Sequence, residues 1–525
     1  MARILVSDPI TAAGIELFKE AGFEVDVKTD HTPEELKEKI KNYDALIVRS
    51  QTKVTAEIIA AADNLKVIGR AGVGVDNVDV EAATKKGIIV LNAPDGNTIS
   101  TAELTVAMIL ALARNIPQAH GSMKNGAWDR KKYVGVEVNR KVLGIVGMGR
   151  IGTEVAKRML AMGMTVNAYD PFFTTERAES LGVNLVDLDT IITQSDFITV
   201  HTPLTPETKG LFGAKEFARM KKGVRLVNCA RGGIYDEKAL AEAVKSGHVA
   251  GVALDVYPEE PPTDRTLIDL PQVIVTPHLG ASTVEAQENV AIDVAVEVIK
   301  VLKGESFKNA VNLPALKPEV RAAIQPFTGL VESLGKFIGQ LVTGRIKKLE
   351  VNYMGEISTV DTSYLSLLFV KGLLQARLNG EVTPVNAMVL AQERGLKVNE
   401  VKTKDVIGYA NLIKISVTTE TGTHTLTGTV FENGMKVVEI EGFHFDLVPE
   451  GNLIVVDHID QPGIIGEVGT ILGANRINIA SMQVGRKVQG GKALMVLAVD
   501  SAVTPEILSR IENVANVAKA NAVYL

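Results

Sequence analysis

A glycine-rich segment, GIVGMGRIG at residues 144–152, constrains the fold of this chain more than any other feature. Gly147, Gly149 and Gly152 have the spacing G-x-G-x-x-G, directly after an apolar run and before a helical pattern. A second apolar run ends at Asp170, 18 residues after Gly152. Glycines so placed let a backbone approach a pyrophosphate at a helix N-terminus, and the acid accepts hydrogen bonds from a ribose. The segment predicts a Rossmann domain, and the carboxylate favours NAD over NADP because it repels a 2′-phosphate. A tight strand–helix turn that binds no ligand is the alternative.

Strand and helix patterns alternate from residue 1 to about residue 300, with short glycine-containing loops between them. This alternation predicts an α/β fold with two doubly wound parallel sheets, since a chain of 525 residues is too long for one core. We expect a flavodoxin-like substrate-binding domain at residues 1–98 and 283–305. The NAD-binding Rossmann domain is expected at residues 99–282.

A long apolar helix is expected between these two sheets. Ser100 and Glu103 have the spacing of a capping box, so the helix is predicted to begin at Ser100. Most of its faces are apolar, which indicates burial between domains or subunits. Residues 312–320, with two prolines, are the predicted linker to the rest of the chain.

The C-terminal part of the chain has a different pattern. Asn433 and Gly434 lie between two alternating strand patterns and predict a two-residue hairpin. Two helix patterns precede them, which indicates an intervening α+β domain at residues 312–450. Residues 451–525 follow the order strand, helix, strand, strand, helix, strand, and this order predicts a ferredoxin-like βαββαβ domain.

Composition excludes several classes of function. The one cysteine, Cys229, rules out an intramolecular disulfide and a cysteine-rich metal site, and we predict no metal. A net charge of -6 does not favour nucleic-acid binding. The apolar helix patterns are shorter than the ~18 residues needed to span a bilayer, and Asp8 interrupts what would be a signal peptide. We therefore expect a cytoplasmic protein without a membrane partner.

Polar side chains follow three further apolar strand patterns. The segments are NCARGG with Arg231, LDVYPEEPP with Asp255 and Glu260, and TPHLG with His278. Ligands bind beyond the carboxyl ends of parallel strands, so these side chains are expected to converge on the nicotinamide. Alcohol oxidation needs a base for the hydroxyl proton and a cation for the substrate. We predict His278 as the base, Glu260 as the acid that raises its pKa, and Arg231 as the carboxylate-binding group. Seen alone, a loop histidine is more often a surface residue than a base.

The segments GMGRIG…YDP, VHTPLTPET, NCARGG, LDVYPEEPP and TPHLGAST resemble the D-2-hydroxyacid dehydrogenase family. The resemblance runs from about residue 3 to the C-terminus and is closest to the branch that acts on 3-phospho-D-glycerate. It implies the same three catalytic residues and the oxidation of this substrate to 3-phosphohydroxypyruvate, the first step of L-serine biosynthesis. It also implies NAD contacts at Arg150, Ile151, Asp170, Thr202, Cys229, Ala230, Asp255 and Gly280.

A phosphorylated substrate needs additional cations. Arg49 and Arg70 each follow an apolar strand pattern in the first domain, where a side chain would face the cleft. The resemblance places substrate contacts at these arginines and near Asn97, and it implies that Arg130 of a neighbouring subunit reaches the phosphate. For either of the paired arginines alone, a surface salt bridge is the alternative.

The segment DHIDQPGIIGEVGTILGANRINIASM resembles the ACT domain, which binds amino acids in biosynthetic enzymes. His458, Asp460 and Asn478 match the positions that contact serine in that family, where two such domains pair edge to edge. Asp460 could bind an ammonium group and Asn478 a carboxylate or hydroxyl. A purely structural dimerisation domain is the alternative. The resemblance also associates the intervening domain with an anionic effector.

These observations predict a homo-oligomeric NAD-dependent enzyme that L-serine inhibits. Two association surfaces, the helix from Ser100 and the C-terminal domain, favour a tetramer. A glyoxylate or hydroxypyruvate reductase would share the fold and catalytic set without needing the paired arginines or a serine-binding tail. A non-enzymatic NAD sensor is a third possibility, against which the complete Arg–Glu–His set argues.

Overall fold

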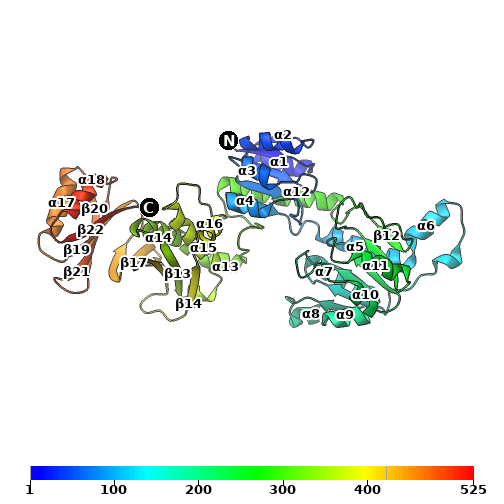
Figure 1. Cartoon of the computed structure of the whole chain (residues 1–525). Coiled ribbons are helices and arrows are strands. Elements are labelled where there is room, and N and C mark those ends of the chain that lie inside the picture. The colour runs from blue at the N-terminus through cyan, green and yellow to red at the C-terminus, as the bar shows by residue number, and fades with distance from the viewer. Residues whose placement is uncertain (1, 421) are drawn as a thin grey trace.

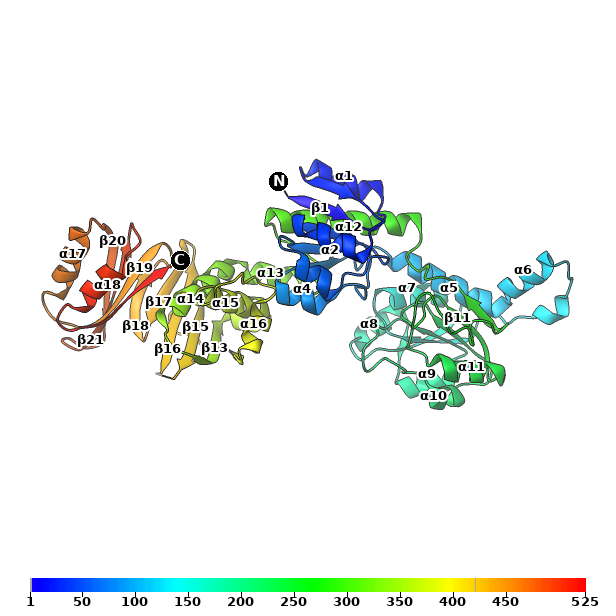
Figure 2. The same ribbon diagram turned by 45° about the horizontal axis from the view of Figure 1, so that its top comes forward.

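The computed structural model describes residues 2–420 and 422–525. Four α/β units follow one another, each built on one sheet, and together they form an elongated molecule (Figures 1 and 2). The two units of the N-terminal half lie at one end and the C-terminal unit lies at the other. The predicted fold class, two parallel sheets followed by an α+β unit and a ferredoxin-like βαββαβ unit, is confirmed.

The first unit is a five-stranded parallel sheet of order β2-β1-β3-β4-β5. Its strands are β1 (Arg3–Val6), β2 (Glu24–Val27), β3 (Ala45–Val48), β4 (Val67–Arg70) and β5 (Ile89–Asn92). Its helices are α1 (Ala12–Glu20), α2 (Pro33–Lys39), η1 (Ile40–Asn42), α3 (Ala56–Ala61) and α4 (Val80–Lys86). The chain returns to this unit after the second one, because α12 (Val284–Lys303) packs on α1 and β4 (Figures 1 and 2).

The second unit is a seven-stranded parallel sheet of order β12-β11-β10-β9-β6-β7-β8. Its strands are β6 (Val142–Val146), β7 (Thr165–Tyr169), β8 (Asn184–Leu185), β9 (Phe197–Val200), β10 (Val224–Asn228), β11 (Val249–Leu254) and β12 (Val273–Val275). Its helices are α5 (Thr98–Arg114), α6 (Ile116–Lys124), η2 (Arg130–Tyr133), α7 (Arg150–Ala161), α8 (Thr175–Leu181), α9 (Leu188–Gln194), α10 (Ala214–Arg219) and α11 (Glu237–Lys245). The strand order reverses between β6 and β9, so a ligand crevice is expected at their carboxyl ends.

Helix α5 differs from its predicted start. It begins at Thr98, preceded by Asn97 without a side-chain cap, so the predicted capping box at Ser100 and Glu103 is wrong. The Ser100 hydroxyl instead meets Oγ1 of Thr283 at 2.7 Å, a partner that tertiary folding supplies. The buried face of α5 packs on α7, β10 and β11. Within the described ranges no single helix is long and apolar enough to cross a membrane. Helices α5 and α6 together have the necessary length and composition, but they are bent by 65° relative to each other.

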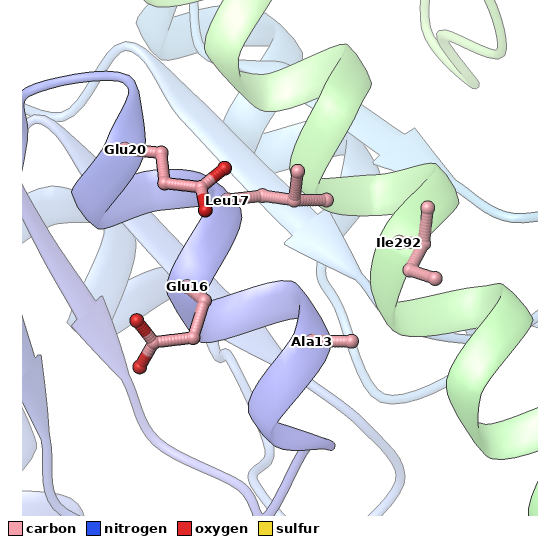
Figure 3. Close-up of a pocket in the computed structure, with 5 residues that line it drawn as sticks. All are labelled: Ala13, Glu16, Leu17, Glu20 and Ile292. Carbon is pink, nitrogen blue, oxygen red and sulfur yellow. The ribbon is translucent and has the colours of Figure 1, made fainter.

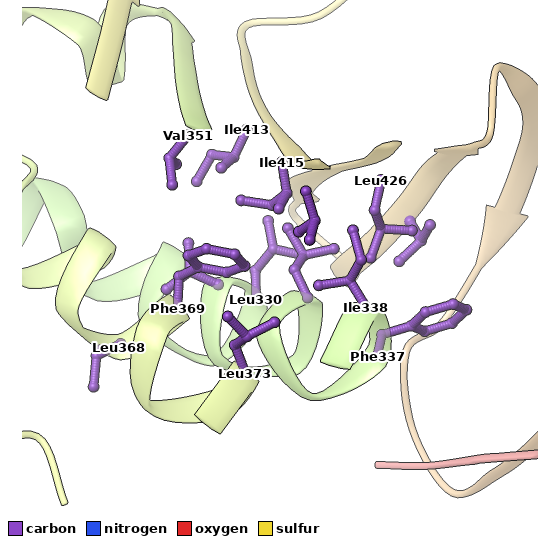
Figure 4. Packing of buried hydrophobic residues seen from close by; sticks show 14 of the residues in the cluster. Leu330, Phe337, Ile338, Val351, Leu368, Phe369, Leu373, Ile413, Ile415 and Leu426 are labelled. Carbon is purple, nitrogen blue, oxygen red and sulfur yellow. The ribbon is translucent and has the colours of Figure 1, made fainter. Parts of the chain in front are cut away.

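The third unit is a six-stranded sheet of order β14-β13-β15-β16-β17-β18, with one face covered by α14 and α15 (Figure 4). Its strands are β13 (Ile346–Gly355), β14 (Val398–Thr403), β15 (Asn411–Thr419), β16 (Thr423–Phe431), β17 (Gly434–Ile440) and β18 (Phe443–Leu447). Its helices are α13 (Pro318–Ile324), η3 (Gln325–Phe327), α14 (Thr328–Leu341), η4 (Glu356–Thr359), α15 (Ser363–Gln375) and α16 (Ala387–Glu393). Phe369 and Leu373 of α15 point toward Ile413 and Ile415 of β15 in this core (Figure 4).

Two predictions for this region need correction. Residues 312–320 are not all linker, because α13 begins at Pro318. Asn312 is tied to the first unit through bonds to the backbone of Val90 at 2.9 Å and Ile88 at 2.9 Å. The hairpin is present, but Phe431 pairs with Gly434, so its two turn residues lie one position earlier than predicted.

The fourth unit has the predicted βαββαβ order and forms an antiparallel sheet, β20-β21-β19-β22. Its elements are β19 (Asn452–Ile459), α17 (Ile464–Ala474), β20 (Ile479–Arg486), β21 (Lys492–Val499), α18 (Pro505–Glu512) and β22 (Val517–Tyr524). One face of the sheet carries α17 and α18, and the other shares the core of the third unit. The amide of Gln483 bonds both backbone groups of Asp446, and Gln340 does the same for Tyr524, so the two units are also joined by hydrogen bonds.

Candidate functional site

The glycine-rich loop after β6 has the shape of a dinucleotide cradle. Gly147 has φ 96°, and a Cβ there would lie 2.6 Å from the carbonyl oxygen of His201. A Cβ at Gly152 would lie 2.1 Å from the carbonyl oxygen of Gly147, which fixes α7 closely against the loop. A Cβ at Gly149 would meet nothing within 4 Å. The first and third glycines are therefore needed for packing, whereas the second leaves the space a pyrophosphate would use.

The residues around this cradle also fit a dinucleotide. The carboxylate of Asp170 accepts hydrogen bonds from the backbone N–H of Met148 at 2.7 Å and of Phe172 at 2.8 Å, which holds it beside the loop. The hydroxyl of Thr202 is buried without a partner within residues 2–420 and 422–525. An acid fixed at the end of β7 and an unpaired hydroxyl at the end of β9 are groups that a ribose and nicotinamide could bond.

The remaining residues expected to contact NAD lie at the same edge of the sheet. They occupy the segments directly after β6, β10, β11 and β12: Arg150, Ile151, Cys229, Ala230, Asp255 and Gly280. The Cys229 thiol is buried, its Sγ lies 3.4 Å from Sδ of Met108, and burial raises its pKa to about 12. A thiol with so high a pKa is not a nucleophile near neutral pH.

His278 and Glu260 form a hydrogen-bonded pair at this edge. Nδ1 of His278 lies 2.7 Å from Oε2 of Glu260, and Oε1 of Glu260 accepts a hydrogen bond from the N–H of Tyr257 at 3.1 Å. The bond to Glu260 raises the pKa of His278 and outweighs the opposite effect of burial. Burial would raise the pKa of Glu260, but the bond and charge of His278 lower it. The arrangement leaves Nε2 of a basic imidazole available to exchange a proton with a substrate.

The turn that carries His278 is anchored by Asp255. Its Oδ1 accepts from the Thr276 hydroxyl at 2.6 Å and from the N–H of Leu279 at 2.7 Å, and its Oδ2 accepts from the N–H of Gly280 at 2.8 Å. His278 itself has φ 55°, a left-handed conformation that these bonds hold in place. The sequence predicts Asp255 as a site residue but does not indicate that it anchors this turn. The only sequence signal for the anchoring is an acid at the end of β11, the strand that pairs with β12.

Arg70 lies close enough to Arg231 and to Arg49 for the charge of each to affect its pKa. Burial and the charges of Arg231 and Arg49 together lower the pKa of Arg70 to about 10, against the opposing charge of Asp76. Nε of Arg70 and Oδ1 of Asn97 are both buried, and neither atom has a hydrogen-bond partner within the described ranges. The structure thus brings a buried cation of the first unit together with Arg231 of the second. Such a cluster can bind a small molecule that carries two anionic groups.

Arg130 is not part of this cluster within the chain. It is exposed and belongs to η2, which follows α6 on an arm that projects from the second unit (Figure 1). The hollow between α1 and α12 does not coincide with the cluster either. It measures about 320 Å³, and Glu16 and Glu20 are its charged lining residues (Figure 3).

The three residues matched to a serine site are spread over the fourth unit. His458 is buried, and its Nε2 has no partner within residues 2–420 and 422–525. Asp460 accepts from Arg486 Nη1 at 2.7 Å, which lowers its pKa. Asn478 donates to Asp500 at 2.8 Å.

Asp460 and Asn478 lie at opposite ends of this sheet. Asp460 follows the pair Ile459–Lys492, whereas Asn478 precedes the pair Ile479–Val499. The eight residues of β21, Lys492–Val499, separate those pairs by about 23 Å. One small amino acid therefore cannot contact both residues within a single chain.

Comparison with known proteins covers the whole chain. Residues 106–280 match the D-isomer specific 2-hydroxyacid dehydrogenase NAD-binding domain, 323–441 the D-3-phosphoglycerate dehydrogenase intervening domain, and 452–516 the ACT domain. Proteins named D-3-phosphoglycerate dehydrogenase from Archaeoglobus fulgidus and Bacillus subtilis are each 47% identical to it, over 100% of both chains.

A solved structure of D-lactate dehydrogenase from Aquifex aeolicus, complexed with NAD and lactic acid, matches the catalytic half. It is 29% identical, with a TM-score of 0.52, and the match covers 58% of this chain and 96% of that one. The glycine cradle, the fixed acid and the matched NAD-binding domain together establish NAD as the cofactor.

Proposed function

The chain belongs to the D-3-phosphoglycerate dehydrogenase family of NAD-dependent dehydrogenases, and we propose that it oxidises 3-phospho-D-glycerate to 3-phosphohydroxypyruvate. The observation that carries this proposal is the arginine cluster beside His278. Arg231, Arg70 and Arg49 provide cations for both a carboxylate and a phosphate, and His278 provides the base. A reductase of unphosphorylated acids would need one such cation, not three.

In the proposed mechanism Arg231 binds the substrate carboxylate and holds the hydroxyl carbon near the base. Nε2 of His278 takes the hydroxyl proton, and the Glu260 carboxylate stabilises the imidazolium that forms. Asp255 acts through the backbone, by holding the turn that presents His278. When bound in the cradle of Gly147, NAD supplies the hydride acceptor for this chemistry.

Arg70 and Arg49 are proposed to bind the phosphate. Arg70 is mostly buried, and its Nε has no hydrogen-bond partner among residues 2–420 and 422–525, so an incoming anion would supply that bond. Asn97, whose Oδ1 also lacks a partner in the described part of the chain, is proposed to contact the substrate. Arg130 of a partner subunit is proposed to complete the phosphate site.

We further propose L-serine as a feedback inhibitor bound by His458, Asp460 and Asn478. The separation of Asp460 from Asn478 along β21 favours a site between the ACT domains of two subunits. A homotetramer that associates through the catalytic half and through the ACT domains would supply both the partner's Arg130 for the phosphate site and the serine site between ACT domains. The cytoplasmic location and the anionic effector of the intervening domain stay predictions.

The test is NADH formation with 3-phospho-D-glycerate and with D-glycerate, each with and without L-serine. The proposal requires strong preference for the phosphorylated acid, and serine inhibition if the ACT domain is a sensor. Preference without inhibition would leave the ACT domain as an assembly element. Equal activity on both acids would refute the roles of Arg49 and Arg70 and favour a general hydroxyacid reductase.

A further inference from the structure

Arg231 has one edge on which a carboxylate can form two parallel hydrogen bonds without competing with the backbone. Its Nη1 donates to the carbonyl of Ala230 at 2.7 Å. The edge formed by Nε and Nη2 is left, and it faces the loop that follows β4 in the first unit. A Cβ at Gly74 of this loop would lie 2.0 Å from Nη2 of Arg231 and 2.7 Å from Oδ2 of Asp76. The guanidinium edge and the Asp76 carboxylate therefore meet at one point.

Asp76 already occupies the edge that a substrate carboxylate would use. Its Oδ2 lies 3.3 Å from Nε of Arg231, and the pair joins the first unit to the second across the cleft. The same relation occurs at the cofactor side, where Nε of Arg150 pairs with Asp95. In both places an acid of the first unit binds an arginine of the second unit that is expected to bind an anionic ligand.

We propose that Asp76 is an internal competitor for the substrate carboxylate, which raises the KM of every carboxylate substrate by the same factor. This inference rests on the proposed function, because it assumes that Arg231 binds the substrate through its carboxylate. Binding is then an exchange, in which the incoming carboxylate replaces Asp76 on the Nε–Nη2 edge. Every carboxylate substrate meets the same opposition. A phosphorylated substrate has a second anionic group, which Arg49 and Arg70 attract independently of Asp76.

The exposure of the pair sets the size of this effect. The Asp76 side chain is 75% exposed and that of Arg231 is 30% exposed. Exposed ion pairs are weak, and breaking one changes an equilibrium by a factor of roughly 1.5 to 5. The competition is therefore small enough for substrate to overcome and large enough to measure as a change in KM.

The test compares Asp76→Asn with Asp79→Asn as a matched control. Asp79 lies in the same loop and caps α4 by accepting from the N–H of Ala82 at 2.9 Å, a role asparagine also performs. Both variants lose one negative charge. For Asp76→Asn we expect KM to fall about two- to fivefold for 3-phospho-D-glycerate and by the same factor for D-glycerate, with kcat changed less than twofold. Asp79→Asn should leave both constants as in the unsubstituted protein.

Three outcomes would overturn the inference. A higher KM or a lower kcat in Asp76→Asn would mean that Asp76 orients Arg231 for the substrate. An equal decrease in both variants would mean that general charge, not competition for one edge, sets KM. A substrate-induced rise in melting temperature that is no larger in Asp76→Asn, measured with NAD present, would show unchanged binding independently of turnover. If the unsubstituted enzyme turns over neither acid, the proposed function itself fails, which separates the two conclusions.

Discussion

Replacing Glu260 with glutamine tests how the His278 base is tuned. The change keeps the size of the side chain and removes its charge. In the unsubstituted protein the bond at 2.7 Å raises the pKa of His278 from 6.5 and lowers that of Glu260 from 4.5. Without the carboxylate, burial and the charge of Arg231 lower the pKa of His278, and the charge of Asp255, a smaller effect than burial, opposes them. The substitution should therefore move the histidine titration to lower pH.

The magnitude follows from the exposure of the pair. A hydrogen bond to a charged group is worth ~1.5–3 kcal/mol, whereas an exposed ion pair is worth ~0.2–1 kcal/mol. The side chains of His278 and Glu260 are 47% and 38% exposed, between those limits. We therefore expect the imidazolium formed in the transition state to lose ~1–2 kcal/mol, a decrease in kcat of roughly 5- to 30-fold.

The assay is the pH dependence of kcat/KM for NADH formation, between about pH 5 and pH 9. Oxidation needs neutral His278, so the rate rises as pH passes its pKa. The midpoint of this rise should lie above 6.5 in the unsubstituted enzyme and below 6.5 in Glu260→Gln. Reduction needs the protonated form and should lose its high-pH activity in the variant. An unmoved or upward-shifted midpoint would refute the assignment of Glu260 as the partner of the base.

The same pair contributes to stability only within a pH window. The raised pKa of His278 means that its contribution is complete below 6.5 and is lost as pH rises through the raised value. The lowered pKa of Glu260 means that its contribution is complete above 4.5 and is lost as pH falls through the lowered value. The melting temperature of Glu260→Gln should therefore differ most from that of the unsubstituted protein between these pH values, and least at alkaline pH.

Four further substitutions test other parts of the protein. His278→Ala should lower kcat by about 10²- to 10⁴-fold while NADH, followed by its fluorescence, still binds; near-normal turnover would remove His278 as the base. Gly149→Val should keep the melting temperature and raise the KM for NAD roughly tenfold or more, since its side chain enters the pyrophosphate space. Gly152→Ala, which places a Cβ 2.1 Å from the carbonyl oxygen of Gly147, should instead destabilise the fold by ~1–3 kcal/mol. A destabilised Gly149→Val together with a Gly152→Ala of unchanged stability would contradict the roles given to these two glycines. Asn478→Ala should raise the serine concentration for half-inhibition about fivefold at unchanged uninhibited kcat, and equal sensitivity would place the effector elsewhere.

The parts of the fold that the sequence predicts are those that local patterns determine. The strand–glycine–helix segment at Gly147 and the βαββαβ order after residue 451 depend on periodicity and turn residues close in sequence. The capping box at Ser100 fails because the hydroxyl finds a partner 183 residues away, on Thr283. The hairpin is displaced by one residue at Asn433, because strand register also depends on packing against α14.

Site residues, too, divide into those that local sequence patterns indicate and those that only tertiary contacts reveal. Arg231, Glu260 and His278 can be found from sequence because parallel strands bring their carboxyl ends to one edge. The anchoring by Asp255 and the contact of Asp76 with Arg231 cannot, since each depends on how two segments meet in space. Asp460 and Asn478 are only 18 positions apart in one motif, yet the register of β21 places them at opposite ends of the sheet.

This separation links regulation to assembly. If one effector molecule contacts both Asp460 and Asn478, it must bridge two chains, and binding then stabilises the pairing of ACT domains. The ACT sheet shares an apolar core with the intervening domain and is hydrogen-bonded to it. The intervening domain in turn contacts the first unit, where the Thr383 hydroxyl donates to the carbonyl of Gly87 at the end of α4. An effector that reorients paired ACT domains would therefore act on the unit that carries Arg70, and it would alter the approach of Arg70 to Arg231 across the cleft.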